Sequence, residues 1–111
     1  MDSNNYKCLI TPQAVEDIDE ALAYITNDLN NPLAAKKLFE KITETVERIA
    51  LFPSSMPKVK NDAITLGRDY RRAEVDNFVL IYKIEESVQQ VRIMAAHYGP
   101  SDVISRLMER L

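Results

Sequence analysis

Two places in the chain carry side chains that could act on a phosphodiester. One is His97-Tyr98, which contains the only histidine of the chain, and the other is the pair Arg71-Arg72. RNA cleavage by attack of a 2′-hydroxyl needs a base for the hydroxyl proton, a cation for the developing charge and an acid for the leaving oxygen. A histidine, a tyrosine and an arginine can supply these three roles. The four residues are therefore candidates for a catalytic site.

Each candidate also has a plain structural interpretation. His97 can be a solvated or hydrogen-bonded histidine at the end of a strand. Strand alternation places Arg71 and Arg72 on opposite faces of a sheet, so one of them should reach an open face and could bind a phosphate or a carboxylate bidentately. The alternative for these arginines is an ion pair with acids of the predicted helices. The residues alone leave both interpretations open.

The charge of the chain is unevenly distributed. The net charge is −3, which argues weakly against a protein that grips nucleic acid through phosphates. Residues 12–52 carry eight acids against four bases, whereas residues 57–72 carry two acids against five bases. We therefore expect any anionic partner to meet the second half of the chain, at Lys58, Lys60, Arg68, Arg71 and Arg72.

Other kinds of chemistry have little support. Cys8 lies in an apolar segment and is expected in the core. The acids Glu16, Asp17, Asp19 and Glu20 are interpreted as the negative charge that a helix start favours. They lack His or Cys partners for a transition-metal site. The chain also lacks a glycine-rich phosphate loop. We therefore predict neither a metal nor a cofactor.

Composition indicates one globular domain spanning residues 1–111. Apolar residues make up 46% of the chain and charged residues 28%, a typical balance for a soluble domain. A single cysteine gives no sign of disulfides, and no apolar run is long enough to span a bilayer. The polar N-terminus does not resemble a signal peptide. We therefore expect a cytoplasmic protein without membrane contact.

The first half of the chain predicts a strand and two helices. Tyr6–Ile10 has strand character, and Thr11-Pro12 is a helix-start signal. Asn30-Asn31-Pro32 should separate the two helices, and Phe52-Pro53 should end the second. The expected core stripes are Val15, Ile18, Leu22, Ile25 and Leu29 on the first helix, and Ala35, Leu38, Ile42, Val46 and Ile49 on the second.

The second half predicts a loop, three strands and a short helix. Residues 53–66 should form the loop, and the strands should span Tyr70–Val75, Phe78–Ile84 and Val88–His97. Ser101 should cap the last helix. The order β-α-α-β-β-β-α indicates an α+β fold with a mainly antiparallel sheet. The antiparallel helical hairpin should cover one face, and the other should be open and carry the function.

Three stretches resemble the RelE/ParE superfamily of toxins from type II toxin–antitoxin pairs. The first is ITPQAVEDIDEALAYI, which is similar to the family's strand and first helix. The second is YRRAEVDNFVLIYKI, which resembles its strand pair, and the third is VRIMAAHYGPSD, which resembles its closing strand and turn. Together with the element order, these stretches extend the resemblance over nearly the whole chain.

The resemblance implies a toxin that arrests growth when its antitoxin is lost, and a toxin–antitoxin hetero-oligomer. RelE-like members are ribosome-dependent mRNA endonucleases, whereas ParE-like members poison DNA gyrase without nuclease activity. His97-Tyr98 resembles the terminal His-Tyr pair of one nuclease branch, although thirteen residues follow it here. Lys58 and Lys60 are expected to be solvated loop residues, although the resemblance to RelE-like enzymes implies that a lysine in this region can aid catalysis.

Two departures weaken the nuclease interpretation. Val79 stands where the RelE-like strand carries an arginine, and Ser101 replaces the arginine of the closing turn. Missing cations weaken the stabilisation of a phosphorane-like state. Three hypotheses follow: a ParE-like gyrase toxin, which we favour; a divergent endonuclease using His97, Tyr98, Arg71 and Arg72; and an inactive relative that only binds a partner.

Overall fold

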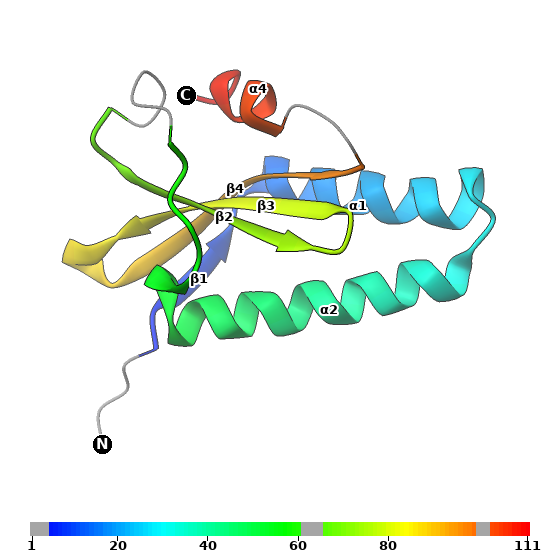
Figure 1. The fold of residues 1–111 in the computed structure, drawn as a ribbon, viewed down its shortest axis with the longest axis horizontal. Helices are drawn as coiled ribbons and strands as arrows, with labels where there is room; N and C mark the ends of the chain where they lie inside the picture. The colour runs from blue at the N-terminus through cyan, green and yellow to red at the C-terminus, as the bar shows by residue number, and fades with distance from the viewer. Residues whose placement is uncertain (1–4, 61–65, 100–102) are drawn as a thin grey trace.

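The computed structural model describes residues 5–60, 66–99 and 103–111. Its elements are β1 (Lys7–Ile10), α1 (Pro12–Ala23), a π-helical turn η1 (Tyr24–Asp28), α2 (Pro32–Leu51), a 3-10 turn η2 (Pro53–Ser55), β2 (Asp69–Val75), β3 (Phe78–Glu85), a 3-10 turn η3 (Glu86–Val88), β4 (Gln90–Tyr98) and α4 (Val103–Met108). The α+β class and the predicted order are confirmed (Figure 1).

The four strands form one sheet in the order β1-β4-β3-β2. β1 runs parallel to β4, and the other two pairings are antiparallel. The central position of β3 explains its nearly continuous apolar sequence, because both of its faces are covered. β4 begins at Gln90, two residues later than predicted, since Glu86–Val88 form a 3-10 turn and Gln89 adopts a left-handed backbone with φ of 49°.

The helical hairpin covers one face of the sheet, as predicted. Thr11 and Asn31 cap the two helices through their side-chain oxygens, which accept hydrogen bonds from Ala14 and Ala34. The main core lies between the hairpin and the sheet, with Ile49, Phe78 and Leu80 almost inaccessible. Figure 1 shows that the hairpin tip extends beyond the end of the sheet.

The predicted stripe of α1 was wrong at both ends. Val15 and Leu29 are 43% and 47% exposed, and the buried face is built instead from Ala14, Ile18, Ala21 and Ile25 together with Asp17. Small alanines let the helix approach the sheet closely. The π-helical turn at Tyr24–Asp28 adds a residue to its turn and rotates Leu29 away from the core.

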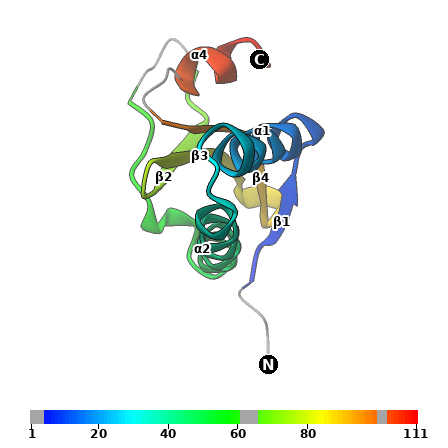
Figure 2. The ribbon, with the colours of Figure 1, turned by 90° about the vertical axis from the view of Figure 1, so that its right-hand side faces the viewer.

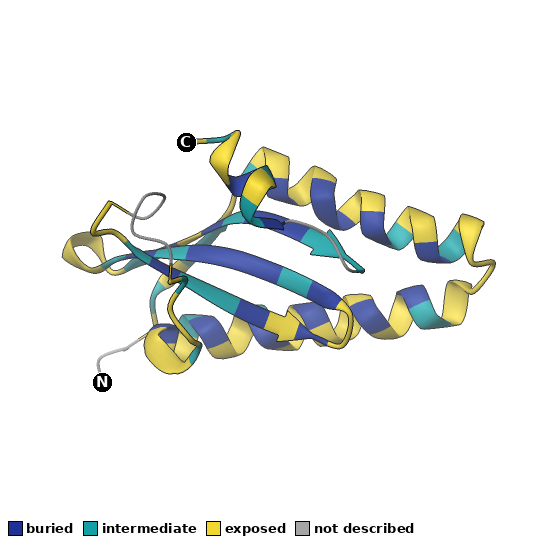
Figure 3. Cartoon of the chain, turned by 45° about the horizontal axis from the view of Figure 1, so that its top comes forward, coloured by how far each residue is buried: buried dark blue, intermediate teal, exposed yellow. Residues whose placement is uncertain are grey.

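The opposite face of the sheet is partly covered, whereas the sequence analysis predicted that this face would be open. α4 packs across it and forms a second, smaller core with Tyr70, Ile81, Ala95, Val103 and Leu107 (Figures 2 and 3). Val103 and Leu107 are both at most 2% exposed. The last helix therefore covers part of the surface that the sequence assigned to function. The predicted cap at Ser101 lies outside the described residues.

Candidate functional site

β4 continues beyond the strand that it pairs with. β1 has four residues and ends opposite Ile93, whereas β4 has nine and continues to Tyr98. The backbone of β4 beyond Ile93 therefore needs other hydrogen-bond partners on that edge. Side chains supply them: the Asp17 carboxylate accepts from the Ala96 N–H at 2.9 Å, and Arg106 donates to the Ala96 carbonyl at 3.1 Å.

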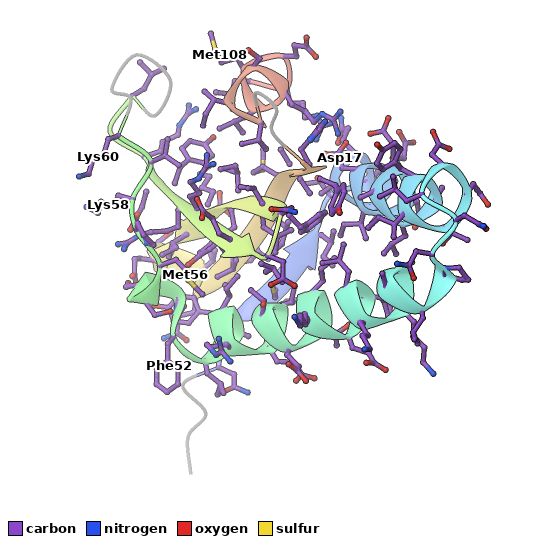
Figure 4. The ribbon with its side chains drawn as sticks, turned by 45° about the vertical axis from the view of Figure 1, so that its right-hand side comes forward. Asp17, Phe52, Met56, Lys58, Lys60 and Met108 are labelled. Carbon is purple, nitrogen blue, oxygen red and sulfur yellow. The ribbon has the colours of Figure 1, made fainter. Side chains whose placement is uncertain are left out.

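Asp17, Arg106 and Arg110 form a buried ionic group, here called the Asp17 cluster. Asp17 accepts from Arg106 at 2.8 Å and from both terminal nitrogens of Arg110 at 2.6 and 2.8 Å. Arg110 also donates to the Met94 carbonyl at 3.0 Å. Figure 4 shows Asp17 where α1, β4 and α4 meet. The cluster thus joins three elements that are distant in sequence.

Opposing effects set the pKa of Asp17. Burial by itself raises it, because the charged form loses water. The hydrogen bonds from Arg110 and the Ala96 N–H, together with the charges of Arg110 and Arg106, outweigh that effect and hold the pKa below the ordinary value. Asp17 is therefore an ionised, neutralised structural group, and the interpretation of this acid as helix-start charge is wrong.

A cavity of about 480 Å³ lies beside the Asp17 cluster, between α1, η1 and the end of β4. We call it the tyrosine cavity. The rings of Tyr24 and Tyr98 stand on its wall with centroids 6.1 Å apart and planes tilted by 48°. Glu20, Leu29, Asn77 and His97 also line it. His97 Nδ1 is buried and has no hydrogen-bond partner within the described part of the chain.

A second cavity of about 220 Å³ adjoins the first, and Asn77 and Tyr98 line both cavities. Its walls come from α2 and the β2–β3 turn, including Lys37, Leu38 and Lys41. Lys41 is bound to Asp76 at 2.8 Å.

The four candidate catalytic residues do not converge on one point. The strand register pairs Arg71 with Tyr82 and Tyr98 with Phe78, so these two side chains lie on the hairpin face. Arg72 pairs with Ile81 and His97 with Val79, on the α4 face. Only His97 and Tyr98 line the tyrosine cavity.

Arg71 has a complete set of partners within the chain. It donates to Asp69 at 2.8 Å and to the carbonyl oxygens of Ser54 and Met56 at 3.1 and 2.8 Å. Its side chain is only 12% exposed. The acid that it pairs with is therefore a neighbour on β2, not an acid of the helices. Arg71 fixes the segment that leaves α2 against the edge of the sheet.

The other basic candidates lie at the β2 edge. Arg72 is 38% exposed and pairs with Glu74 at 3.1 Å. Lys58 bridges the backbone of Arg71, so the loop carrying Lys58 and Lys60 lies along β2, and both lysines are exposed, as is Arg68. Two strand spacings of roughly 4.8 Å separate β2 from β4. Figure 4 shows Lys58 and Lys60 on the opposite side of the molecule from Asp17.

Cys8 packs partly buried against the main core, and burial raises the pKa of its thiol. Within the described residues, no group of three His, Cys, Asp or Glu side chains is arranged to hold a metal ion. No described helix is both long and apolar enough to cross a membrane.

Sequence reasoning missed Arg106, Arg110, Tyr24 and Asn77. The arginines stand four residues apart near the C-terminus, a spacing that puts them on one face of a helix. That spacing was a usable signal for a buried acid partner. Tyr24 and Asn77 gave no comparable signal, because their proximity to Tyr98 arises from tertiary structure.

Comparison with known proteins gives a consistent result. A family model described as the ParE toxin of the type II toxin-antitoxin system parDE matches residues 8–96. No curated protein sequence matches the chain.

Three solved structures share the fold. The chromosomal ParDE system from P. aeruginosa is 16% identical, with a TM-score of 0.66, and covers 87% of this chain and 99% of its own. The RelBE2 complex of Mycobacterium tuberculosis is 14% identical, with a TM-score of 0.61, over 87% and 94%. The RelE-RelB complex of Pyrococcus horikoshii OT3 is 16% identical, with a TM-score of 0.53, over 86% and 97%.

Proposed function

Since the chain belongs to the ParE toxin family of type II toxin–antitoxin systems, we propose that it arrests growth by binding DNA gyrase and not by cutting RNA. In this proposal the toxin works as a binding protein in the cytoplasm, where its target lies, and a cognate antitoxin neutralises it. Fold alone does not separate gyrase toxins from mRNA nucleases, so the proposal rests on the chemistry around His97.

The single observation that carries the proposal is that the described lining of the tyrosine cavity contains no lysine or arginine. Asp17 and Glu20 line the cavity together with His97. The nearest arginines, Arg106 and Arg110, are committed to Asp17 and Glu20, so a scissile phosphate beside His97 would find no uncommitted cation in the described lining where its transition state needs positive charge.

The placement of the arginines supports the same proposal. Arg71 is held by Asp69 and two carbonyl oxygens, and Arg72 lies two strands from β4. Arg71 lies on the opposite face of the sheet from His97, and Arg72 is paired with Glu74, so both guanidinium groups are engaged by acids of β2.

One observation favours the alternative of a RelE-like mRNA endonuclease. His97 Nδ1 lacks a hydrogen-bond partner within the described chain, and Tyr98 adjoins it. An unpartnered imidazole nitrogen is a candidate proton-transfer group, although the Tyr98 side chain lies on the other face of the sheet. In this alternative Arg72, on the same face as His97, would be the cation that binds the phosphate.

The antitoxin is the second part of the proposal. The similar solved structures are described as toxin–antitoxin systems or complexes, and on that basis we expect a hetero-oligomer. Its carboxylates should meet the exposed bases at the β2 edge, which are Lys58, Lys60, Arg68 and Arg72. Arg71 is expected to contribute less, because its donors are already engaged.

A reconstituted reaction tests the function. Purified toxin is added to DNA gyrase with relaxed plasmid, and separately to translating ribosomes with a defined mRNA. The proposal requires inhibited supercoiling or trapped DNA breaks, with the mRNA intact. Cleaved mRNA with unaffected gyrase would replace the proposal with the nuclease alternative. The His97→Ala variant should inhibit gyrase to the same extent as the natural chain does.

A further inference from the structure

We propose that the tyrosine cavity is a recognition pocket for an arginine side chain that the antitoxin presents. The occupant rests on the proposed toxin–antitoxin pairing, whereas the chemistry of the pocket rests on its own lining. Glu20 supplies a carboxylate at the rim, and Tyr24 and Tyr98 supply two ring faces on the wall. No lysine or arginine is among the described residues that line the cavity, although Arg106 reaches Glu20 from outside the lining.

Glu20 is the available acceptor of the pocket. Arg106 Nη1 lies within hydrogen-bond distance of three oxygens, at 2.8 Å from Asp17, 3.1 Å from the Ala96 carbonyl and 3.2 Å from Glu20. A terminal guanidinium nitrogen carries only two hydrogens, so one of the three oxygens is incompletely satisfied. Glu20 is the most distant of them, and its side chain is 68% exposed. It can therefore accept a second cation from a partner.

The remaining groups of the cavity match a guanidinium better than an anion or a neutral aliphatic side chain. Tyr24 is 45% exposed, and a planar cation can stack on such a ring face. Leu29 and Ala21 provide apolar surface for the methylene stem of the arginine. Arginine brings donors only, so it leaves no acceptor of its own unpaired among these oxygens and rings.

The dimensions favour an arginine that belongs to a polypeptide. The second cavity, of about 220 Å³, shares Asn77 and Tyr98 with the first and is also lined by residues of α2. Leu29 on the wall of the first cavity and Leu33 in the first turn of α2 are exposed apolar side chains, at 47% and 61% exposure. A segment that places an arginine in the first cavity would thus continue over apolar surface. An antitoxin is a polypeptide, so it could place an arginine in the first cavity and also contact this apolar surface.

Two amide-capped amino acids test the chemistry of the pocket on the isolated full chain. N-acetyl-arginine amide and N-acetyl-citrulline amide have nearly the same shape, but only the first is charged. In NMR titrations the arginine derivative should shift the ring signals of Tyr24 and Tyr98. The citrulline derivative should bind at least roughly threefold more weakly, the factor that an exposed cation–π contact supplies. Equal binding of the two, or shifts confined to other surfaces, would overturn the pocket.

Variants of two acids on α1 distinguish binding in the pocket from a nonspecific effect of negative charge. Glu20→Gln should weaken binding of the arginine derivative roughly threefold or more, because it removes the exposed carboxylate that would pair with the guanidinium of the ligand. Asp19→Asn is the matched control, since Asp19 is an exposed acid of the same helix that does not line the cavity. Tyr24→Leu should also weaken binding while keeping an apolar side chain there. Glu20→Gln and Asp19→Asn acting alike would contradict the inference.

The antitoxin complex tests the occupant. Glu20→Gln, but not Asp19→Asn, should raise the dissociation constant of the complex by a similar factor. A pocket that binds the arginine derivative while Glu20→Gln leaves antitoxin affinity unchanged would overturn the antitoxin as its occupant. Gyrase takes no part in these measurements. Failure of the proposed gyrase activity is therefore distinguishable from failure of this inference.

Discussion

At the scale of single residues, Asp17 is the group on which most of the local structure depends. Its side chain is 6% exposed, yet it is charged and engaged by two arginines and one backbone N–H. Removing one member of a buried ionic group leaves the others desolvated and unpaired, which costs more than the group itself contributes. The sequence predicted an acid here but not its burial, because burial depends on where β1 ends and where α4 docks.

Replacing Asp17 with Asn should therefore destabilise the chain strongly. We expect the free energy of unfolding to fall by about 3 kcal/mol, because two arginines lose their counter-charge inside a poorly hydrated site. Urea unfolding followed by circular dichroism measures this. Asp19→Asn, an exposed change on the same helix, should alter the value by less than about 0.5 kcal/mol. Similar effects from both variants would mean that the Asp17 cluster contributes little.

The lowered pKa of Asp17 predicts a pH dependence of stability. Its folded pKa lies below the unfolded value of about 3.9, so its contribution is fully present above that value. The contribution is lost as the pH falls through the folded pKa. The difference in unfolding free energy between the natural chain and Asp17→Asn should be constant from pH 7 to pH 5 and should shrink below pH 4. A difference that grows on acidification would contradict the assigned ionisation.

At the scale of elements, α4 decides how the sheet is used. Sequence patterns predicted the hairpin, all four strands and the short last helix within two residues for most boundaries. They did not predict where the last helix packs, since a six-residue helix has too few apolar positions to define its docking face. They also missed the π-helical turn at Tyr24–Asp28, because no sequence rule marks an inserted residue inside a good helical pattern.

Shortening one buried side chain of α4 should loosen that helix. Leu107 is inaccessible to solvent, and Leu107→Ala should cost about 2–4 kcal/mol by leaving a cavity against Ile81 and Ala95. Met108→Ala is the control, because Met108 is 55% exposed on the same helix. Amide hydrogen exchange should show faster exchange in α4 for the first variant alone. Unchanged protection of α4 in Leu107→Ala would show that the ionic group suffices to hold the helix.

At the scale of the whole molecule, the basic and acidic regions lie on different sides. The exposed bases of residues 58–72 follow the β2 edge, while the tyrosine cavity with Glu20 lies beside α1 and β4. The sequence predicted the basic region, because its bases are close together in the chain. The cavity could not be predicted in that way, since its walls come from residues 17–29, 77 and 97–99. A partner that contacts both regions must wrap around the end of the sheet.

Charge reversal at the β2 edge should weaken the antitoxin complex. The variant Lys58→Glu/Arg72→Glu replaces two exposed bases, and both the association rate and the salt dependence of binding should fall. Surface plasmon resonance at two salt concentrations measures both. Lys36→Glu on α2 is a control with an exposed lysine outside this edge. Unaltered association kinetics would place the antitoxin on another surface.

The most direct test of the central claim is to induce the toxin alone in cells and to follow mRNA integrity and gyrase-dependent DNA breaks together. The natural chain and His97→Ala are compared in the same experiment. The account predicts DNA breaks with intact mRNA, and the same result for His97→Ala. Rapid mRNA cleavage that His97→Ala abolishes would contradict it and identify His97 as the catalytic group of a nuclease.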